Sequence, residues 1–375
     1  MKKIVIFILA LSLFSAVPVK SYAKQEQIKA KSSILMCMDT KEVLIEDNAY
    51  EHLSPASVTK IMSILLIMEA IDSKQISLKD TVTASENAVS KGGSQIWLEV
   101  GEKMTVDELL KAVIIASAND ACTLLAEYVA GSDSAFVDKM NERAKQLGLK
   151  NSNFENCTGL DDDTTNHYSC AYDLAIIACE VMKHPLVEKY STVWLDYLRD
   201  GKTELNNTNK LVNKYNGLTG LKTGTTSNAG FCLCATAKRE SLSLVSVVLG
   251  ADTSEDRFNL STQLLDKGFA EYKLSKITID ENKINTVKVK NGVLKKVKPV
   301  YDGNGSILLK KNSGKLTYEY NCKKEVKAPV KKGQELGEII VKSDGKKVAC
   351  VKLISKDNIQ IVDFIYIFRK MLINT

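Results

Sequence analysis

The stretch SPASVTK at residues 54–60 is followed by an almost wholly apolar run, and together they predict the beginning of a buried helix. Ser54 is a suitable N-cap, and Pro55 suits the first helical position, where a backbone N–H has no intrahelical partner in any case. Ser57 then falls in the first turn, and Lys60 lies three residues later on the same face.

The pairing of Ser57 with Lys60 indicates a nucleophile and its base. A serine hydroxyl reacts well only when a neighbouring base removes its proton, and a neutral lysine amine is such a base. Lowering a lysine pKa from about 10.4 to near 7 requires roughly 4 to 5 kcal/mol, which burial against an apolar helix can supply. The backbone N–H of Ser57 is also an unpaired donor that can receive an oxyanion. Alone, however, the pattern SxxK fits an ordinary helix start equally well.

A second polar group, Ser117-Ala118-Asn119, follows a helix whose beginning is marked by a capping box between Thr105 and Glu108. We therefore expect it in a turn after a rigid helix. A hydroxyl at Ser117 can relay protons between Lys60 and a leaving amine, and Asn119 can hold both Lys60 and a substrate amide by hydrogen bonds. Taken alone, the group also fits a common helix-ending turn.

A third group, Lys222-Thr223-Gly224-Thr225, stands just ahead of a strand-like run at residues 230–237. A lysine beside hydroxyls on a strand edge can bind a substrate carboxylate, and Gly224 allows a peptide backbone to approach closely. Alone, this group too is compatible with a simple loop.

The order and spacing of the three groups are far more specific than any one of them. Ser-x-Asn lies 60 residues after the SxxK serine and Lys-Thr-Gly another 105 residues on, which is the signature of penicillin-recognising serine enzymes. The flanking residues resemble low-molecular-mass D-alanyl-D-alanine carboxypeptidases nearly end to end. The matching segments are PASVTK at 55–60, SANDA at 117–121, CTGL at 157–160, HYS at 167–169 and GLKTG at 220–224.

The resemblance implies a role for each residue of the three groups. Ser57 would be the acylated nucleophile, Lys60 the proton acceptor and Ser117 the third catalytic residue, while Asn119, Lys222, Thr223, Gly224 and Thr225 would bind substrate. The backbone N–H of Thr225 would complete an oxyanion hole with that of Ser57. The implied reaction removes the terminal D-alanine from peptidoglycan stem pentapeptides, with β-lactam antibiotics as further ligands and no cofactor.

The order of predicted elements places these groups in one α/β domain, residues 24–275, and the resemblance implies that this domain is of the β-lactamase/transpeptidase-like class. Strand-like runs at 33–44, 230–237 and 241–249 enclose a mostly helical stretch at 83–185. Such an order predicts a sheet assembled from both ends of the domain.

Residues 276–356 differ in character and predict a small all-β domain. Short alternating runs are broken by turn pairs such as Asn291-Gly292 and Asp344-Gly345. The segment holds 20 lysines, no arginine and 8 acidic residues, a net charge of +12 within a chain of +6. This charge can attract anionic wall polymer or lipid head groups, but lysines on exposed strands also simply prevent edge aggregation. APVKKG at 328–333 resembles the C-terminal β domain of the same family.

Both ends of the chain predict contact with the membrane system. Residues 1–23 have a basic start, an apolar centre and a small-x-small site ending at Ala23, which is typical of a cleaved signal peptide. Residues 357–375 carry apolar residues at near-helical spacing, with Arg369 and Lys370 among them, and predict an amphipathic anchor helix; a helix packed on the β domain is the alternative. The enzyme is therefore expected on the outer face of the cytoplasmic membrane, where nucleic acid is no partner.

The cysteines and histidines predict structural rather than catalytic roles. Nine cysteines at irregular spacing fit buried apolar positions better than a disulfide framework, and Cys232 and Cys234 should share one face of a strand. The three histidines, His52, His167 and His184, show no HExxH spacing, so no metal is expected.

Three alternatives remain open at this point. A class A β-lactamase would resemble the chain in its three groups, but its deacylating Glu-x-x-x-Asn segment has no counterpart at 120–221. A D,D-endopeptidase acting on crosslinked wall is closer. A non-catalytic wall-binding or antibiotic-sensing protein would not need a nucleophile paired with a base.

Overall fold

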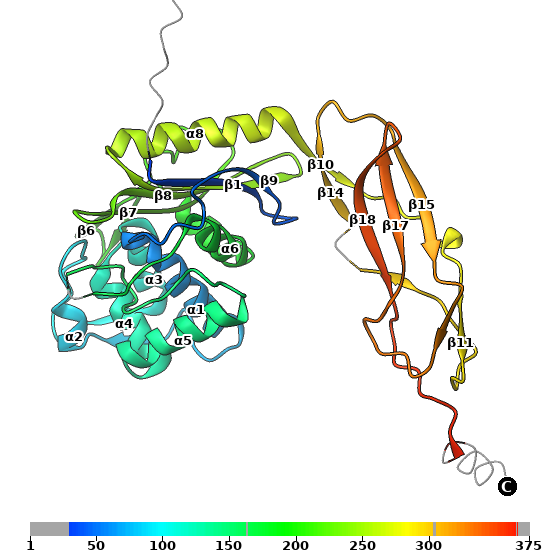
Figure 1. Cartoon of the computed structure of the whole chain (residues 1–375). Coiled ribbons are helices and arrows are strands. Elements are labelled where there is room, and N and C mark those ends of the chain that lie inside the picture. The colour runs from blue at the N-terminus through cyan, green and yellow to red at the C-terminus, as the bar shows by residue number, and fades with distance from the viewer. Residues whose placement is uncertain (1–29, 163, 303–304, 365, 367–375) are drawn as a thin grey trace, which may run out of the picture.

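Strands from opposite ends of the first 275 residues meet in one antiparallel sheet, as predicted (Figure 1). The computed structural model describes residues 30–162, 164–302, 305–364 and 366, so the predicted signal peptide lies outside the described residues. The sheet has the order β2-β1-β9-β8-β7. Its strands are β1 (Ser32–Cys37), β2 (Val43–Asp47), β7 (Leu218–Thr226), β8 (Gly230–Arg239) and β9 (Leu242–Ala251).

Helices cover both faces of this sheet (Figure 1). One face carries α8 (Ser254–Glu271). The other faces a larger layer: α1 (Lys60–Asp72), α2 (Glu86–Val89), α3 (Val106–Ile115), α4 (Asn119–Ala130), α5 (Asp133–Gln146), α6 (Ala171–Val181) and α7 (Pro185–Ser191). Two ribbons, β3 (Thr81–Thr83) with β4 (Lys103–Thr105) and β5 (Leu195–Leu198) with β6 (Thr203–Asn206), flank that layer.

Strand β8 separates the two hydrophobic cores by the alternation of its side chains. Cys232 and Cys234 are fully buried in the large core, on the side of the sheet that carries α6, whereas Leu233 and Ala235 belong to the smaller core beneath α8. The prediction that the two cysteines share a face is therefore confirmed. Seven of the nine cysteines are buried, and all nine are free thiols.

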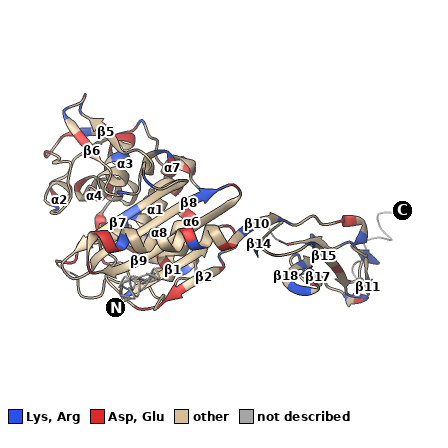
Figure 2. Cartoon of the chain, turned by 90° about the horizontal axis from the view of Figure 1, so that it is seen from above, with Lys and Arg blue, Asp and Glu red and all other residues tan. Residues whose placement is uncertain are grey.

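An all-β unit follows α8 directly, because β10 (Tyr272–Lys276) begins at the residue after the helix ends. β10 pairs with β14 (Ser306–Lys310), and two further sheets of three and four strands complete the unit. The remaining strands are β11 (Val287–Lys290), β12 (Lys296–Val297), β13 (Val300–Tyr301), β15 (Leu316–Cys322), β16 (Glu325–Lys327), β17 (Glu335–Ser343) and β18 (Lys346–Ile354). Figure 2 shows Lys and Arg residues distributed along it.

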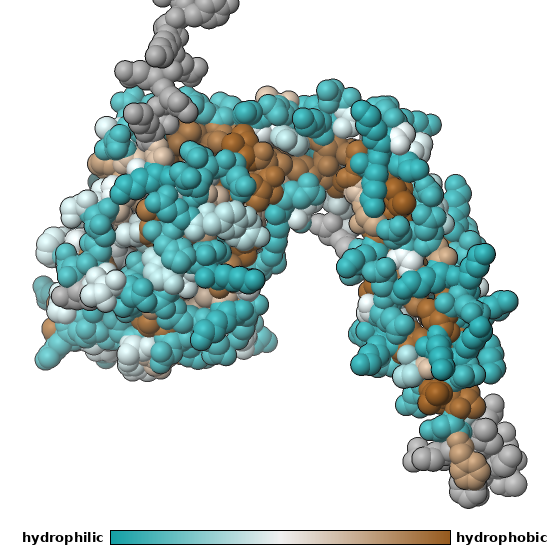
Figure 3. Space-filling model, viewed as in Figure 1, coloured by the Kyte–Doolittle hydropathy of each residue, from teal (hydrophilic) through white to brown (hydrophobic). Residues whose placement is uncertain are grey.

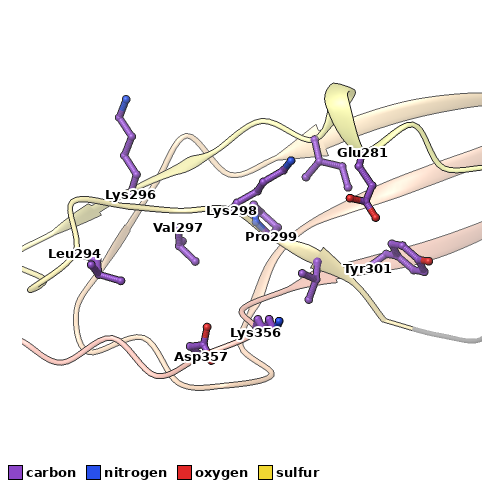
Figure 4. A pocket seen from close by; sticks show the side chains of 11 residues that line it. Glu281, Leu294, Lys296, Val297, Lys298, Pro299, Tyr301, Lys356 and Asp357 are labelled. Carbon is purple, nitrogen blue, oxygen red and sulfur yellow. The ribbon is translucent and has the colours of Figure 1, made fainter.

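The β unit contains a cavity of about 680 Å³ beside β12 and β13 (Figure 4). Its walls are largely apolar, and three lysines and two acidic residues line it as well; the lining includes Leu294, Val297, Val300, Lys296, Lys298, Lys356, Glu281 and Asp357. Apolar patches also reach the surface of this unit between hydrophilic side chains (Figure 3). Binding of a polyanion by the basic β unit stays a prediction.

The segment after β18 corrects part of the predicted C-terminal helix. Ile359 and Ile361 form β-bridges with Val330 and Gly292, so residues 357–362 are extended rather than helical. Ile359 is only 1% exposed and belongs to the core of the β unit. The predicted helix included Ile361 and Val362 at near-helical spacing, but backbone bridges to Gly292 and Val330 hold this part of the segment extended. Residues 367–375 lie outside the described residues, and no helix in the described part is long and apolar enough to cross a membrane.

Candidate active site

Ser57 lies in a short 3-10 turn, η1 (Ala56–Thr59), that leads into α1. The prediction that Ser54 caps this helix is wrong. Pro55 occupies the N-cap position without a side-chain cap, and Ala56 has a left-handed φ of 46°. The carbonyl of Ala56 faces Gly159, where an added Cβ would lie 1.8 Å from it, so a contact distant in sequence shapes this turn.

Lys60, the first residue of α1, is fully buried and lies against the serine. Its Nζ donates to Ser57 Oγ at 2.9 Å, to Asn119 Oδ1 at 2.5 Å and to the carbonyl oxygen of Thr158 at 2.8 Å. Burial lowers the pKa of Lys60 to about 8, although the Asp120 carboxylate acts in the opposite direction. With this pKa about a tenth of the amines are neutral at pH 7, and in these molecules Lys60 can accept the serine proton.

Ser117 lies in the turn between α3 and α4, as predicted, and Asn119 is the first residue of α4. The capping box of α3 is present. The Thr105 hydroxyl accepts a hydrogen bond from the backbone amide of Glu108, and the Glu108 carboxylate accepts one from the backbone amide of Thr105 at 2.8 Å. Ser117 has a φ of 65°, and its Oγ accepts a 2.7 Å hydrogen bond from Lys222 Nζ. The serine thus connects the second and third groups.

Lys222, Thr223, Gly224 and Thr225 lie on β7, an edge strand of the sheet. Lys222 is 1% exposed, and its pKa is well below the usual value because of burial and then of the neighbouring positive charge of Lys60. A Cβ on Gly224 would lie 2.7 Å from the Pro55 carbonyl oxygen and 3.0 Å from the amide nitrogen of Ser57. Gly224 therefore lets β7 approach the turn that carries the serine, a role distinct from the substrate approach expected above.

Arg257 on α8 is a site residue that the sequence did not reveal. Its Nη1 donates to the Gly224 carbonyl oxygen at 2.9 Å, to Thr225 Oγ1 at 3.0 Å and to the Cys232 carbonyl oxygen at 3.1 Å. It is only 7% exposed. A single arginine 32 residues beyond the nearest predicted group carries no local signal; only the packing of α8 on β8 and β9 brings it here.

The site concentrates buried positive charge. Across the described residues, no carboxylate lies within 4.0 Å of the charged nitrogens of Lys60, Lys222 or Arg257. Buried charges normally require a partner. Three buried basic groups without a carboxylate partner are suited to bind an anion, which would favour their charged forms.

The three histidines all have hydrogen-bond partners, as predicted for structural residues. His167 lies nearest the site, because its Nε2 lies 2.9 Å from the hydroxyl of Thr59 and its Nδ1 accepts from the amide of Glu155. Burial lowers the pKa of His167 to about 4, so the ring stays neutral. Its hydrogen bond to Thr59 helps to fix the turn of residues 56–59. In the described parts of the chain, no three His, Cys, Asp or Glu side chains are grouped to hold a metal ion.

Comparison with known proteins matches both parts of the chain. A model of the D-alanyl-D-alanine carboxypeptidase family covers residues 19–253, and a model of the penicillin-binding protein 5 C-terminal domain covers residues 272–360. The D-alanyl-D-alanine carboxypeptidase DacF of Bacillus subtilis (strain 168) is 43% identical over 91% of this chain and 89% of its own length. DacC of Escherichia coli (strain K12), also a D-alanyl-D-alanine carboxypeptidase, is 35% identical over 95% and 90%.

The solved structures agree with these sequence matches. Penicillin-binding protein 5 from Haemophilus influenzae superposes with a TM-score of 0.80 at 32% identity, covering 89% of this chain and 98% of that one. Penicillin-binding protein 6B from Escherichia coli gives a TM-score of 0.72 at 30% identity, covering 88% and 96%. The penicillin-recognising fold with an all-β C-terminal domain, predicted from the three groups and their flanks, is thereby confirmed. The chain belongs to the D-alanyl-D-alanine carboxypeptidase family of serine hydrolases.

Proposed function

We propose that Ser57 is the nucleophile with which this enzyme removes the terminal D-alanine from peptidoglycan stem pentapeptides. The observation that carries the proposal is the 2.9 Å contact between Ser57 Oγ and the buried amine of Lys60. Neutral Lys60 takes the hydroxyl proton while Oγ attacks the carbonyl carbon of the penultimate D-alanine. The backbone N–H groups of Ser57 and Thr225 receive the resulting oxyanion.

Collapse of the tetrahedral intermediate breaks the peptide bond and requires a proton on the leaving amine. Ser117 is suited to relay to it the proton that Lys60 took from Ser57, which leaves Lys60 neutral again, and the hydrogen bond from Lys222 to Ser117 Oγ orients this hydroxyl. The released D-alanine leaves an ester on Ser57. Water then attacks this ester, Lys60 again serves as base, and the shortened peptide departs as a carboxylate.

The terminal carboxylate of the substrate explains the buried cations. Thr223 and Thr225 offer hydroxyls at the edge of β7, Lys222 lies behind them, and Arg257 donates to the Thr225 hydroxyl. An anion held there gains charge-assisted hydrogen bonds in a partly desolvated site. This receptor favours cleavage at a chain end over cleavage of an internal crosslink.

The proposal extends to where the enzyme acts. Cleavage after Ala23 would release a protein exported across the cytoplasmic membrane, and an amphipathic tail would hold it peripherally at the outer face. Anchoring there would bring the active site to the cell wall, where β-lactams also meet it.

Mass spectrometry after incubation with a penicillin tests the nucleophile. Peptide mapping should locate one covalent adduct on Ser57, and Ser57→Ala should carry none. Ser63→Ala is the matched control, because Ser63 lies six residues later on α1, is fully buried and donates to the carbonyl oxygen of Cys157. An adduct that persists in Ser57→Ala would show that another residue is acylated.

A further inference from the structure

We infer that Arg199, at the end of strand β5, is a positioning residue that clamps the loop of residues 91–102 against Asn119 and thereby fixes Lys60. The inference rests on the proposed role of Lys60 as the base. Arg199 does not belong to any of the three sequence groups, and it acts on the reaction only through other residues.

The loop of residues 91–102 connects α2 to β4 without helix or strand of its own. Asn119, at the beginning of α4, forms hydrogen bonds with one side of this loop. Asn119 donates from Nδ2 to the Gly92 carbonyl oxygen at 2.7 Å and from its amide to the Ser94 carbonyl oxygen at 2.6 Å. Asn119 thus has the loop on one side and, through Oδ1, the amine of Lys60 on the other.

Asp120 extends this contact along the loop. Its carboxylate is fully buried and accepts from the amides of Ile96 at 3.1 Å, Leu98 at 3.1 Å and Ala121 at 2.8 Å. In the described parts of the chain, it forms no ion pair within 4.0 Å. A buried anion of this kind depends on the donors that the loop presents to it.

Arg199 holds the same loop from another direction. Its Nη1 donates to the Ile96 carbonyl oxygen at 2.8 Å and to Thr203 Oγ1 at 2.8 Å, and its Nη2 lies 3.4 Å from the Trp97 carbonyl oxygen. Glu102, at the far end of the loop, accepts from Nε at 2.7 Å and from Nη2 at 3.0 Å. These bonds are the main cause of the lowered pKa of Glu102, so the pair is ionised at neutral pH.

Ile96 is therefore bound at both its backbone groups, with its N–H to the anion Asp120 and its C=O to the cation Arg199. The backbone dipole at Ile96 points its N–H at the anion and its C=O at the cation. Each charge therefore stabilises the orientation that the other one requires. Neutralising Arg199 removes one of them. The loop then keeps its hydrogen bonds to Asp120 but loses the hydrogen bond from Arg199 that holds Ile96 in position to form them.

Trp97 shows that the loop needs such support. It has a φ of 59°, an unusual backbone conformation for a bulky residue, and its side chain is 75% exposed. The packing of an exposed ring does not stabilise a strained backbone. The hydrogen bonds of its two neighbours to Asp120, and of Ile96 to Arg199, must do so.

The orientation of the Asn119 amide transmits the effect to Lys60. Lys60 needs an oxygen from Asn119, and the Gly92 carbonyl fixes that orientation by taking the NH₂ group. At Gly93, a Cβ would lie 2.7 Å from Asn119 Nδ2, so the loop passes directly against the amide. If the loop moves away, the amide can rotate and Lys60 loses an acceptor that points it at Ser57.

Replacing Arg199 by Met tests the clamp, and Arg143→Met is the matched control. Arg143 bonds Glu69 at 2.6 and 2.9 Å, and its side chain is 24% exposed, the same as that of Arg199. Both variants remove one arginine–glutamate ion pair of similar burial, so the control shows what the loss of such a pair alone does to the acylation rate. We expect Arg199→Met to slow acylation of Ser57 by a penicillin about tenfold or more, whereas Arg143→Met acylates at the wild-type rate.

Two further measurements separate positioning from simple loss of stability. Arg199→Lys, which keeps a cation near Glu102 and Ile96, should recover part of the acylation rate. Millimolar ethylguanidinium should accelerate Arg199→Ala but not Arg143→Ala. Glu102→Gln, a milder change, replaces Arg199→Met if the latter does not fold, and it too should slow acylation.

The inference is overturned if Arg199→Met and Glu102→Gln acylate as fast as Arg143→Met. Failure of the proposed function gives a different result, because wild type and Arg143→Met would then carry no adduct on Ser57 at all.

Discussion

Lys222 Nζ donates a 2.7 Å hydrogen bond to Ser117 Oγ, although the two residues are 105 positions apart in the chain. Both side chains are almost fully buried. The contact makes one lysine serve two of the three groups, since Lys222 lies on β7 and also polarises the hydroxyl that is proposed to protonate the leaving amine.

The acylation rate should rise with pH through about 8. Burial lowers the pKa of Lys60 to about 8, and only the neutral amine accepts a proton, so the active fraction grows as the pH increases past that value. The rate constant for acylation by a penicillin, measured from pH 6 to pH 9.5, should show this rise. Lys60→Arg should be slower by about 10³-fold and should lack the rise, because guanidinium stays protonated. A flat wild-type profile would move the base elsewhere.

The enzyme should distinguish a terminal carboxylate from an amide. Losing a charge-assisted hydrogen bond in a partly desolvated site costs about 2 to 4 kcal/mol, or about 30-fold to about 1000-fold in rate. Amidating the C-terminus of an acyl-D-Ala-D-Ala peptide should reduce kcat/KM by that factor in wild type. Lys222→Ala should already be slow and should discriminate little between the two substrates.

Arg257→Met provides an independent comparison in the same assay. If Arg257 strengthens the receptor through the Thr225 hydroxyl, this variant should lose part of the discrimination and keep more of its activity on the amide. Equal cleavage of acid and amide by wild type would instead favour D,D-endopeptidase activity on internal crosslinks.

Gly159→Ala should destabilise the protein much more than Gly148→Ala. Both glycines have left-handed φ angles, 80° and 75°, but an added Cβ at Gly148 meets nothing within 4 Å, whereas at Gly159 it would lie 1.8 Å from the Ala56 carbonyl oxygen. Backbone strain alone should cost about 1 kcal/mol at Gly148. The clash should raise the cost at Gly159 to roughly 3 kcal/mol or more.

Urea unfolding of the two glycine variants gives this difference directly. Gly159→Ala should also slow acylation, since the displaced carbonyl belongs to the turn that carries Ser57. Equal midpoints for the two variants would mean that the turn relaxes without cost.

Removing residues 364–375 should release the protein from anionic vesicles and leave peptide hydrolysis unchanged. The truncation spares Ile359 and Ile361, whose bridges complete the β unit, and removes the segment proposed to enter the head-group region. Sedimentation with vesicles is the measurement. If the truncated protein still sediments, the basic β unit is the membrane-binding surface.

Much of the fold and site could be predicted because the chemistry imposes a spacing. The Ser57 and Lys60 pair needs one helical turn, and the capping box, the turn at Ser117 and the strand at Lys222 each have local signals. The Ser54 cap failed because the contact of Ala56 with Gly159 is not encoded locally. The roles of Arg257 and Arg199 could not be predicted from the sequence for the same reason, since each acquires its hydrogen-bond partners only through tertiary packing.

The tail illustrates a different limit. Residues 357–375 have apolar positions that suit both a helix and an extended strand, and short segments of this kind cannot be assigned by periodicity alone. The backbone bridge between Val330 and Ile359 decides the matter for Ile359.

The direct passage from α8 into β10 has a practical consequence for handling this enzyme. Proteases cut most readily at exposed, flexible connections, and here the helix ends at Glu271 and the paired strand begins at Tyr272. Limited digestion should therefore fail to liberate the penicillin-binding part as a trimmed fragment. The two parts should instead stay joined in one chain and diffuse as a single particle after protease treatment.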